Sequence, residues 1–152
     1  MNQTPQAGSE QRLTFRLLSY WNRIRAERKI PSLSDVNIAE ILEIWHFSFT
    51  IDVRDVEHRF EYFGPSLSDI FQQDYTGFSV QDAMNDDLVV NNTIGFYERA
   101  VLSMEPVMEA ASFYSEGDEV RYRSIIVPFS SDGQVVDFLV GTTNYKRFKS
   151  DK

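Results

Sequence analysis

Apolar residues near the start of the chain repeat with helical spacing. Between positions 11 and 29 they fall on one face, which predicts an amphipathic helix. That face consists of Leu13, Leu17, Tyr20, Trp21 and Ile24. Phe15 and Leu18 lie off it, so one packing surface cannot easily bury all seven residues. Pro31 ends the helix, because proline cannot continue it.

The segments on either side of this helix are polar. Residues 1–10 include Pro5 and Gly8 among polar neighbours and are expected to form a disordered leader. After Pro31, Ser34 and Asp35 predict the N-cap of a second helix. The buried residues expected for that helix are Ile38, Ile41 and Leu42.

The pattern then changes from helical to alternating. Residues 45–53, WHFSFTIDV, alternate between apolar and polar side chains, which predicts a strand. A turn at 54–57 leads into a second strand at 58–63, and the two should pair as a hairpin. Gly64 and Pro65 end the second strand.

Helices and then strands make up the rest of the chain. Helical segments are expected at 66–73, 80–84 and 86–104. The last is long, and its apolar stripe is Val89, Thr93, Phe96, Tyr97, Ala100 and Met104. Three strands follow near 107–114, 120–129 and 135–145. The turns between them are of hairpin length, so these strands should be antiparallel.

This order of elements predicts an α+β protein. Its core would be a five-stranded antiparallel sheet with helices on one face, preceded by an N-terminal helical extension. The expected divisions are a leader at 1–10, the extension at 11–44, the core at 45–147 and a tail at 148–152.

A small-molecule pocket is expected between the sheet and the helices that face it. The side chains there would be mainly aromatic, which suits a small apolar or aromatic ligand. The candidate lining residues are Phe60, Tyr62, Phe71, Phe96, Tyr97, Tyr122 and Phe138.

Charge is spread unevenly along the 152 residues. Residues 10–29 carry six basic and two acidic side chains, whereas the whole chain has a net charge of −8. The remainder therefore carries −12, which repels phosphate backbones and argues against nucleic-acid binding. No apolar run approaches the ~20 residues of a membrane span, and the polar start does not resemble a signal peptide. A cytoplasmic protein without membrane insertion is expected.

Short motifs at the N-terminal end resemble a family. Tyr20-Trp21, Arg25, Arg28, Pro31 and Ser34-Asp35 look like the signature of single-domain PAS proteins common in alphaproteobacteria, which carry an N-terminal helical extension. Further likeness comes from Phe63-Gly64, Leu67, Tyr75-Thr76-Gly77, Glu105-Pro106, residues 125–129 (IIVPF), Asp132-Gly133 and Gly141. The resemblance covers about residues 13–147. Asn37-Ile38 and Phe63 depart from the usual residues of the family.

The resemblance implies a sensory or regulatory binding module, bacterial in origin, but it names no ligand. Such a module would have no catalytic residues and would signal through association with a small ligand, a signalling protein or a second copy. The alternative is a small α+β enzyme, of isomerase or hydrolase type, that uses the same cavity. An enzyme of that kind would place an Asp–His or Tyr–Asp arrangement inward, and neither His46 nor His58 is well placed for it.

The residue types also bear on cofactors. The chain has no cysteine, which the flavin photosensor branch of this fold needs for its photochemistry. The segment 86–105 contains no histidine, although PAS proteins that hold haem usually take one from this helix. His46 and His58 are expected to be surface residues rather than a metal pair. No cofactor and no metal are therefore predicted.

Two further expectations concern the basic segment. Arg28 lies near the apolar stripe and needs a partner, and Asp35 is close across the Pro31 turn, so an ion pair is expected. A phosphate or effector contact by Arg28 is the alternative. Because Phe15 and Leu18 lie off the main stripe, the same helix of a second copy could cover them. A homodimer through residues 11–30 is therefore predicted.

Overall fold

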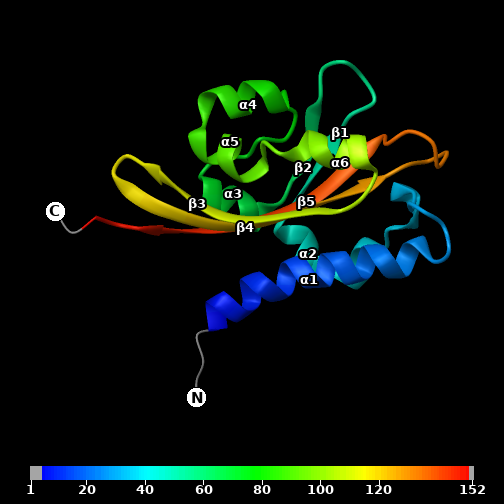
Figure 1. Ribbon diagram of the computed structural model, residues 1–152, viewed down its shortest axis with the longest axis horizontal. Coiled ribbons are helices and arrows are strands. Elements are labelled where there is room, and N and C mark those ends of the chain that lie inside the picture. Colours follow the sequence, from blue (N-terminus) through cyan, green and yellow to red (C-terminus); the bar gives the residue numbers. More distant parts are fainter. Residues whose placement is uncertain (1–4, 151–152) are drawn as a thin grey trace.

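The protein is built in three layers around one sheet (Figure 1). The computed structural model describes residues 5–150, and the side chains of residues 13–150. One helical layer contains α3 (Pro65–Phe71), α4 (Val80–Asp86), α5 (Leu88–Ile94) and α6 (Tyr97–Ser103). The opposite layer contains α1 (Pro5–Arg25) and α2 (Leu42–His46). The sheet between them is thus covered on both faces over much of its area.

All five strands of the sheet are antiparallel. They are β1 (Ser48–Asp52), β2 (Arg59–Phe63), β3 (Val107–Ser115), β4 (Asp118–Phe129) and β5 (Phe138–Phe148). Their order across the sheet is β2-β1-β5-β4-β3, so the last strand lies beside the first. The predicted α+β architecture and both predicted sets of hairpins are confirmed.

Helix α1 uses the predicted apolar face. Leu13, Leu17, Tyr20 and Trp21 are buried, Ile24 is half-buried, and the helix packs against β4 and β5. It begins at Pro5 rather than at residue 11, so the expected leader falls partly in α1 and partly in residues 1–4, outside the described residues. It ends at Arg25, before the expected 29, because Ala26 has a φ of 54°.

The prediction of one continuous helix after Pro31 is wrong. Two short 3-10 turns take its place, η1 (Leu33–Asp35) and η2 (Ile38–Ile41). Each has its own cap: Ser32 caps η1 and Asn37 caps η2, whereas Ser34 and Asp35 lie inside η1. Ile41 is buried as expected. Ile38 and Leu42 are instead exposed, because the interrupted helix does not keep one continuous face.

Two strand and helix boundaries also differ from the prediction. Trp45 and His46 belong to α2, and β1 starts only at Ser48. The polar residues Ser48 and Thr50 of β1 are buried along with its apolar ones, since α2 packs on the face opposite to Phe49. The alternation thus predicted the strand correctly but not its two-sided burial.

The long helix expected at 86–104 is broken in two. Helix α5 ends at Ile94 and α6 begins at Tyr97. Gly95 lies at the break, where glycine is the weakest helix former besides proline, and Phe96 has φ −81° and ψ 8°. Helix α6 then ends at Met104, whose φ is 58°. Despite the break, Val89, Thr93, Tyr97 and Ala100 of the predicted stripe are buried, and Phe96 and Met104 are half-buried.

Candidate functional site

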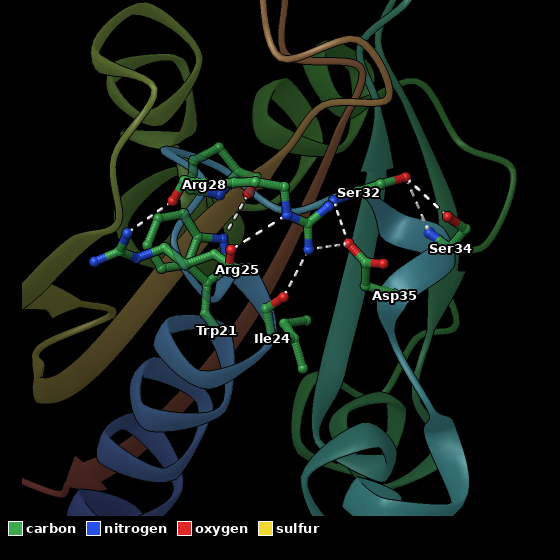
Figure 2. A network of polar contacts seen from close by, with 8 residues as sticks. Trp21, Ile24, Arg25, Arg28, Ser32, Ser34 and Asp35 are labelled. Atoms are coloured by element: carbon green, nitrogen blue, oxygen red, sulfur yellow. Dashed lines mark hydrogen bonds and ion pairs between the residues drawn. The ribbon is translucent and has the colours of Figure 1, made fainter.

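Most residues of the family signature take part in the network of polar contacts in Figure 2, and Tyr20 and Pro31 bond to the chain nearby. The indole Nε1 of Trp21 donates to the backbone oxygen of Pro128 in β4, at 2.7 Å. The hydroxyl of Tyr20 accepts from the backbone N–H of Asn37, at 2.8 Å. Pro31 is buried, and its carbonyl accepts from the backbone N–H of Ser130. The signature therefore anchors α1 and the chain that follows it to the sheet.

The two arginines of the signature hold the turn after α1. Arg25 lies over the ring of Trp21, 5.7 Å from its centroid, and donates to the backbone oxygen of Arg28 at 2.8 Å. Arg28 donates to the backbone oxygens of Ile24 and Arg25, at 2.7 and 3.2 Å. Figure 2 shows both guanidinium groups folded back over the end of the helix. They supply partners for carbonyls that a helix end leaves without them.

Arg28 also forms the predicted ion pair with Asp35, at 2.8 Å, and this expectation is confirmed. Asp35 completes a capping box, because its carboxylate accepts from the backbone N–H of Ser32 at 2.9 Å. The bond from Ser32, followed by Arg28, holds the pKa of Asp35 below its usual value. The donors of Arg28 are directed to these local partners, which favours the structural interpretation over a phosphate contact.

The candidate pocket residues of β2 lie on opposite faces of the sheet. Phe60 is buried on the face of α3–α6, where its ring meets Phe49 and Phe63 edge to face. A bulge in the pairing with β1 places Glu61 as an extra residue. Tyr62 therefore points to the other face, where it stacks on Trp45 with 5.1 Å between ring centroids and donates to its carbonyl.

The remaining candidates are spread along the sheet. Phe71 packs edge to face against both Phe63 and Tyr145. Phe96 is half-buried beneath the guanidinium of Arg99. Tyr122 donates to Glu109 at 2.6 Å, and Phe138 lies against Arg54. The structure thus connects Phe60 and Phe71 through Phe63, but it does not bring the predicted set together around one point.

Tyr97 and His58 form a pair that the sequence analysis did not anticipate. The Tyr97 hydroxyl and His58 Nδ1 are 2.8 Å apart, and the two rings meet edge to face. Burial, followed by the nearby Glu98, raises the pKa of Tyr97 to about 12. His58 is half-buried rather than a plain surface residue, whereas His46 is exposed on α2.

Two glycines of the resemblance have structural roles. Gly64 is buried where α3 begins, and a Cβ there would collide with the backbone carbonyl of His46. Gly77 has a φ of 87°, a conformation that side chains disfavour. Both glycines are therefore explained by backbone geometry.

A cleft opens where α3, the start of α5 and the end of β5 meet. Its volume is about 410 Å³, and its lining residues are Ile70, Phe71, Gln72, Asp87, Val89, Tyr145 and Arg147. Only Phe71 had been named as a pocket residue. The others were missed because they come from three separate elements of the fold. Asp87 is also the N-cap of α5, a structural role that by itself indicates no site.

Polar groups around this cleft are held in place by hydrogen bonds. Tyr75 donates to Asp87 at 2.8 Å, and Tyr145 donates to the backbone oxygen of Ile70 at 2.8 Å. Arg147 donates to the backbone oxygen of Ser115 at 3.1 Å. Burial raises the pKa values of both Tyr75 and Tyr145, and the charge of Asp87 adds to the effect.

Among the described side chains, residues 13–150, no three His, Asp or Glu residues lie close enough to hold a metal ion. No helix in the described part of the chain is long and apolar enough to cross a membrane.

Comparisons with known proteins place the fold. No family model and no curated protein matches the chain. A light-oxygen-voltage domain studied with a flavin analogue matches at a TM-score of 0.50 and 10% identity, over 72% of this chain and 83% of that one. A fungal light-oxygen-voltage photoreceptor domain matches at 0.47 and 16% identity, over 76% and 95%. The PAS domain of Bordetella pertussis BvgS matches at 0.42 and 10% identity, over 76% and 89%.

The match at a TM-score of 0.50 corrects the prediction that no cofactor is bound. The chain shares its fold with a domain whose mechanism was studied with a flavin analogue, so a bound cofactor is compatible with this fold. The missing cysteine bears on cysteine-dependent photochemistry and not on flavin binding itself.

Three aromatic side chains of the described interior leave no room for a flavin ring between them. The rings of Phe60, Phe63 and Tyr75 contact one another, with centroids 5.3, 5.4 and 6.1 Å apart. A flat flavin ring placed among these three side chains would have to displace one of them, so they do not form a flavin slot. In its strand order and in the placement of α3–α6, the protein has a PAS-like fold, with an additional N-terminal helix on the far face of the sheet.

Proposed function

We propose that the protein is a sensory or regulatory module of the PAS type, which signals through association and has no catalysis of its own. The observation that carries this proposal is the position of α1. It lies on the face of the sheet opposite to α3–α6 (Figure 1), outside the PAS-like core. One side of α1 is buried against β4 and β5, and the other remains open to a partner.

The open side of α1 has an apolar centre. Phe15 is 50% exposed, and Leu18 is half-buried beside it. Ser19 and Asn22, one and two turns further along the same side, are exposed and uncharged. A second copy of α1, related by a two-fold axis, would cover Phe15 and Leu18 on both subunits.

Two basic residues of α1, Arg16 and Arg23, are paired with acidic residues of the same chain. Arg16 pairs with Glu43 of α2, and Arg23 pairs with Glu40 of η2. These ion pairs lie within one chain and offset the positive charge of the helix locally. The charges of Arg16 and Arg23 are therefore partly offset before two copies approach along the side of α1 that carries Phe15 and Leu18.

Light scattering tests the proposal on purified protein. The wild type is expected at about twice the 17.7 kDa of one chain. Phe15→Glu with Leu18→Glu should shift it toward the monomer, because two carboxylates per subunit would face each other across the interface. The matched control is Gln81→Glu with Asn91→Glu, which adds the same charge at exposed sites of α4 and α5 and should stay dimeric.

A further inference from the structure

The cleft between α3, α5 and β5 carries two opposite charges that do not pair with each other. Asp87 lies at the start of α5, and Arg147 lies near the end of β5. Arg147 pairs instead with Asp118, at 3.5 Å. Within the described range, Asp87 has no basic partner. A ligand that carries one positive and one negative group could therefore pair with both residues at once.

The carboxylate of Asp87 is fixed in orientation. One oxygen accepts from the backbone N–H groups of Val89 and Val90, at 2.9 and 3.4 Å. The other accepts from the hydroxyl of Tyr75, at 2.8 Å. All three donors are neutral, so they orient the carboxylate without neutralising its charge. This wall of the cleft is therefore suited to a cationic group.

The guanidinium of Arg147 forms the opposite wall. Its described hydrogen bonds, to Ser115 and Asp118, are both made by Nη1. Nε and Nη2 have no hydrogen-bond partner among the side chains of residues 13–150 or the described backbone, and they keep their donors for a bound anion. A guanidinium binds a carboxylate through two such parallel donors. This wall is therefore suited to a carboxylate.

Tyr145 lines the same cleft and is close enough to both charges to be affected by each. Its pKa is raised first by burial and then by Asp87, whereas Arg147 opposes the rise, so both charges act on the same hydroxyl. Phe71 packs against its ring, and Val89 and Ile70 add apolar surface. The volume of about 410 Å³ lies within the ~300–1,000 Å³ usual for small-molecule sites.

We propose that this cleft binds a small zwitterion of amino-acid size. Its ammonium group would lie at Asp87, its carboxylate at Arg147, and its apolar part against Phe71 and Tyr145. This inference rests on the proposed function, in that it names the class of ligand such a module would sense. The ligand is polar at two points, unlike the purely apolar or aromatic one that the sequence predicts.

The first test uses the wild-type protein and three probes that share a phenyl ring and differ in their charged groups. L-phenylalanine keeps both charges, N-acetyl-L-phenylalanine lacks the cation, and 2-phenylethylamine lacks the carboxylate. In a titration of ¹⁵N-labelled protein followed by NMR, L-phenylalanine should give saturable shifts at Gln72, Val89 and the Arg147 side chain. Each of the other two should bind about tenfold more weakly, since one charge-assisted contact is lost. Equal binding of all three probes, or no saturable shift with any, would overturn the inference.

Three variants then assign the charges to their residues. Asp87→Asn keeps an oxygen for the helix cap and removes the negative charge, so only L-phenylalanine and 2-phenylethylamine should lose affinity. Arg147→Met should weaken L-phenylalanine and the N-acetyl compound, and Arg147→Lys should restore part of that loss. A folded Asp87→Asn protein that binds L-phenylalanine as tightly as the wild type does would contradict the assignment.

Light scattering of the same samples separates this inference from the proposed function. A dimer that shows no charge-selective binding would overturn the ligand class alone. A monomer that binds L-phenylalanine selectively would support the site and overturn association through α1. The wild-type probe series needs no substitution, so a variant that fails to fold leaves the test intact.

Discussion

Residues 13–35 and residues 64–104 are both mostly helical, yet they are held in place in different ways. The end of the first segment, after α1, is fixed by polar contacts between residues close in sequence, such as Arg28 with Asp35 and Asp35 with Ser32. The second segment is fixed by close packing against elements that are distant in the chain. Gly64, for example, lies directly against the backbone carbonyl of His46. Contacts between residues close in sequence can be predicted from their spacing, whereas tertiary packing depends on elements that are distant in the chain.

The largest expected effect lies in the first segment and concerns Trp21. Trp21→Ala should lower the free energy of unfolding by about 3–5 kcal/mol, because a large buried ring is lost. Trp21→Phe keeps most of the apolar contact and removes the bond to Pro128, so it should cost only about 1–2 kcal/mol. Urea unfolding followed by circular dichroism measures both. Similar losses in the two variants would mean that the ring itself contributes little to docking α1.

The next effect lies in the second segment. Gly64→Ala should destabilise the protein by about 1–3 kcal/mol, since the added methyl group meets the backbone of His46 and Trp45. Gly117→Ala is a useful contrast, because no atom lies within 4 Å of its added methyl group and its φ of 85° is the only obstacle. If Gly64→Ala unfolds at the same urea concentration as the wild type, the short distance between residue 64 and the His46 carbonyl does not require glycine there.

A smaller, pH-dependent effect belongs to Asp35. Its pKa is lower in the folded protein than its usual 3.8, so the unfolded state binds more protons as acid is added. The stability that Asp35 contributes is therefore present at neutral pH and is lost as the pH falls through the folded pKa. Asp35→Asn should cost about 1 kcal/mol at pH 7 and should flatten the loss of stability below about pH 4. Parallel acid profiles of the two proteins would show that Asp35 is not a source of this dependence.

The smallest effect concerns the bond between Tyr97 and His58. Tyr97→Phe should cost about 0.5–1.5 kcal/mol, because one hydrogen bond is lost while the buried ring remains. A double-mutant cycle with His58→Ala measures the energy of the pair directly. Additive losses in the double variant would mean that the contact contributes nothing of its own.

The sequence predicted those parts of the fold whose signals are local. The apolar face of α1, the first hairpin and the Arg28–Asp35 ion pair follow from spacings of a few residues. The sheet could be foreseen as well, because turn residues separate its strands at hairpin length.

The candidate site was harder to predict, since tertiary contacts decide it. The bulge at Glu61 turns Tyr62 away from Phe60, and no alternation in β2 signals it. The cleft joins groups far apart in the chain: Tyr145 bonds to Ile70, which is 75 residues earlier. Arg147 looked like one charge among many at the end of a strand, and only the folded chain places it across from Asp87.

Cross-linking through a single introduced cysteine tests the central claim, association through α1, most directly. The natural chain has no cysteine, so Ser19→Cys provides one thiol per subunit on the open side of the helix. Mild oxidation should convert it to a disulfide-linked dimer, and Phe15→Glu with Leu18→Glu in the same chain should prevent this. Gln81→Cys, on α4 of the opposite layer, should remain monomeric under the same conditions. A Ser19→Cys protein that cross-links no faster than the Gln81→Cys protein would contradict the account.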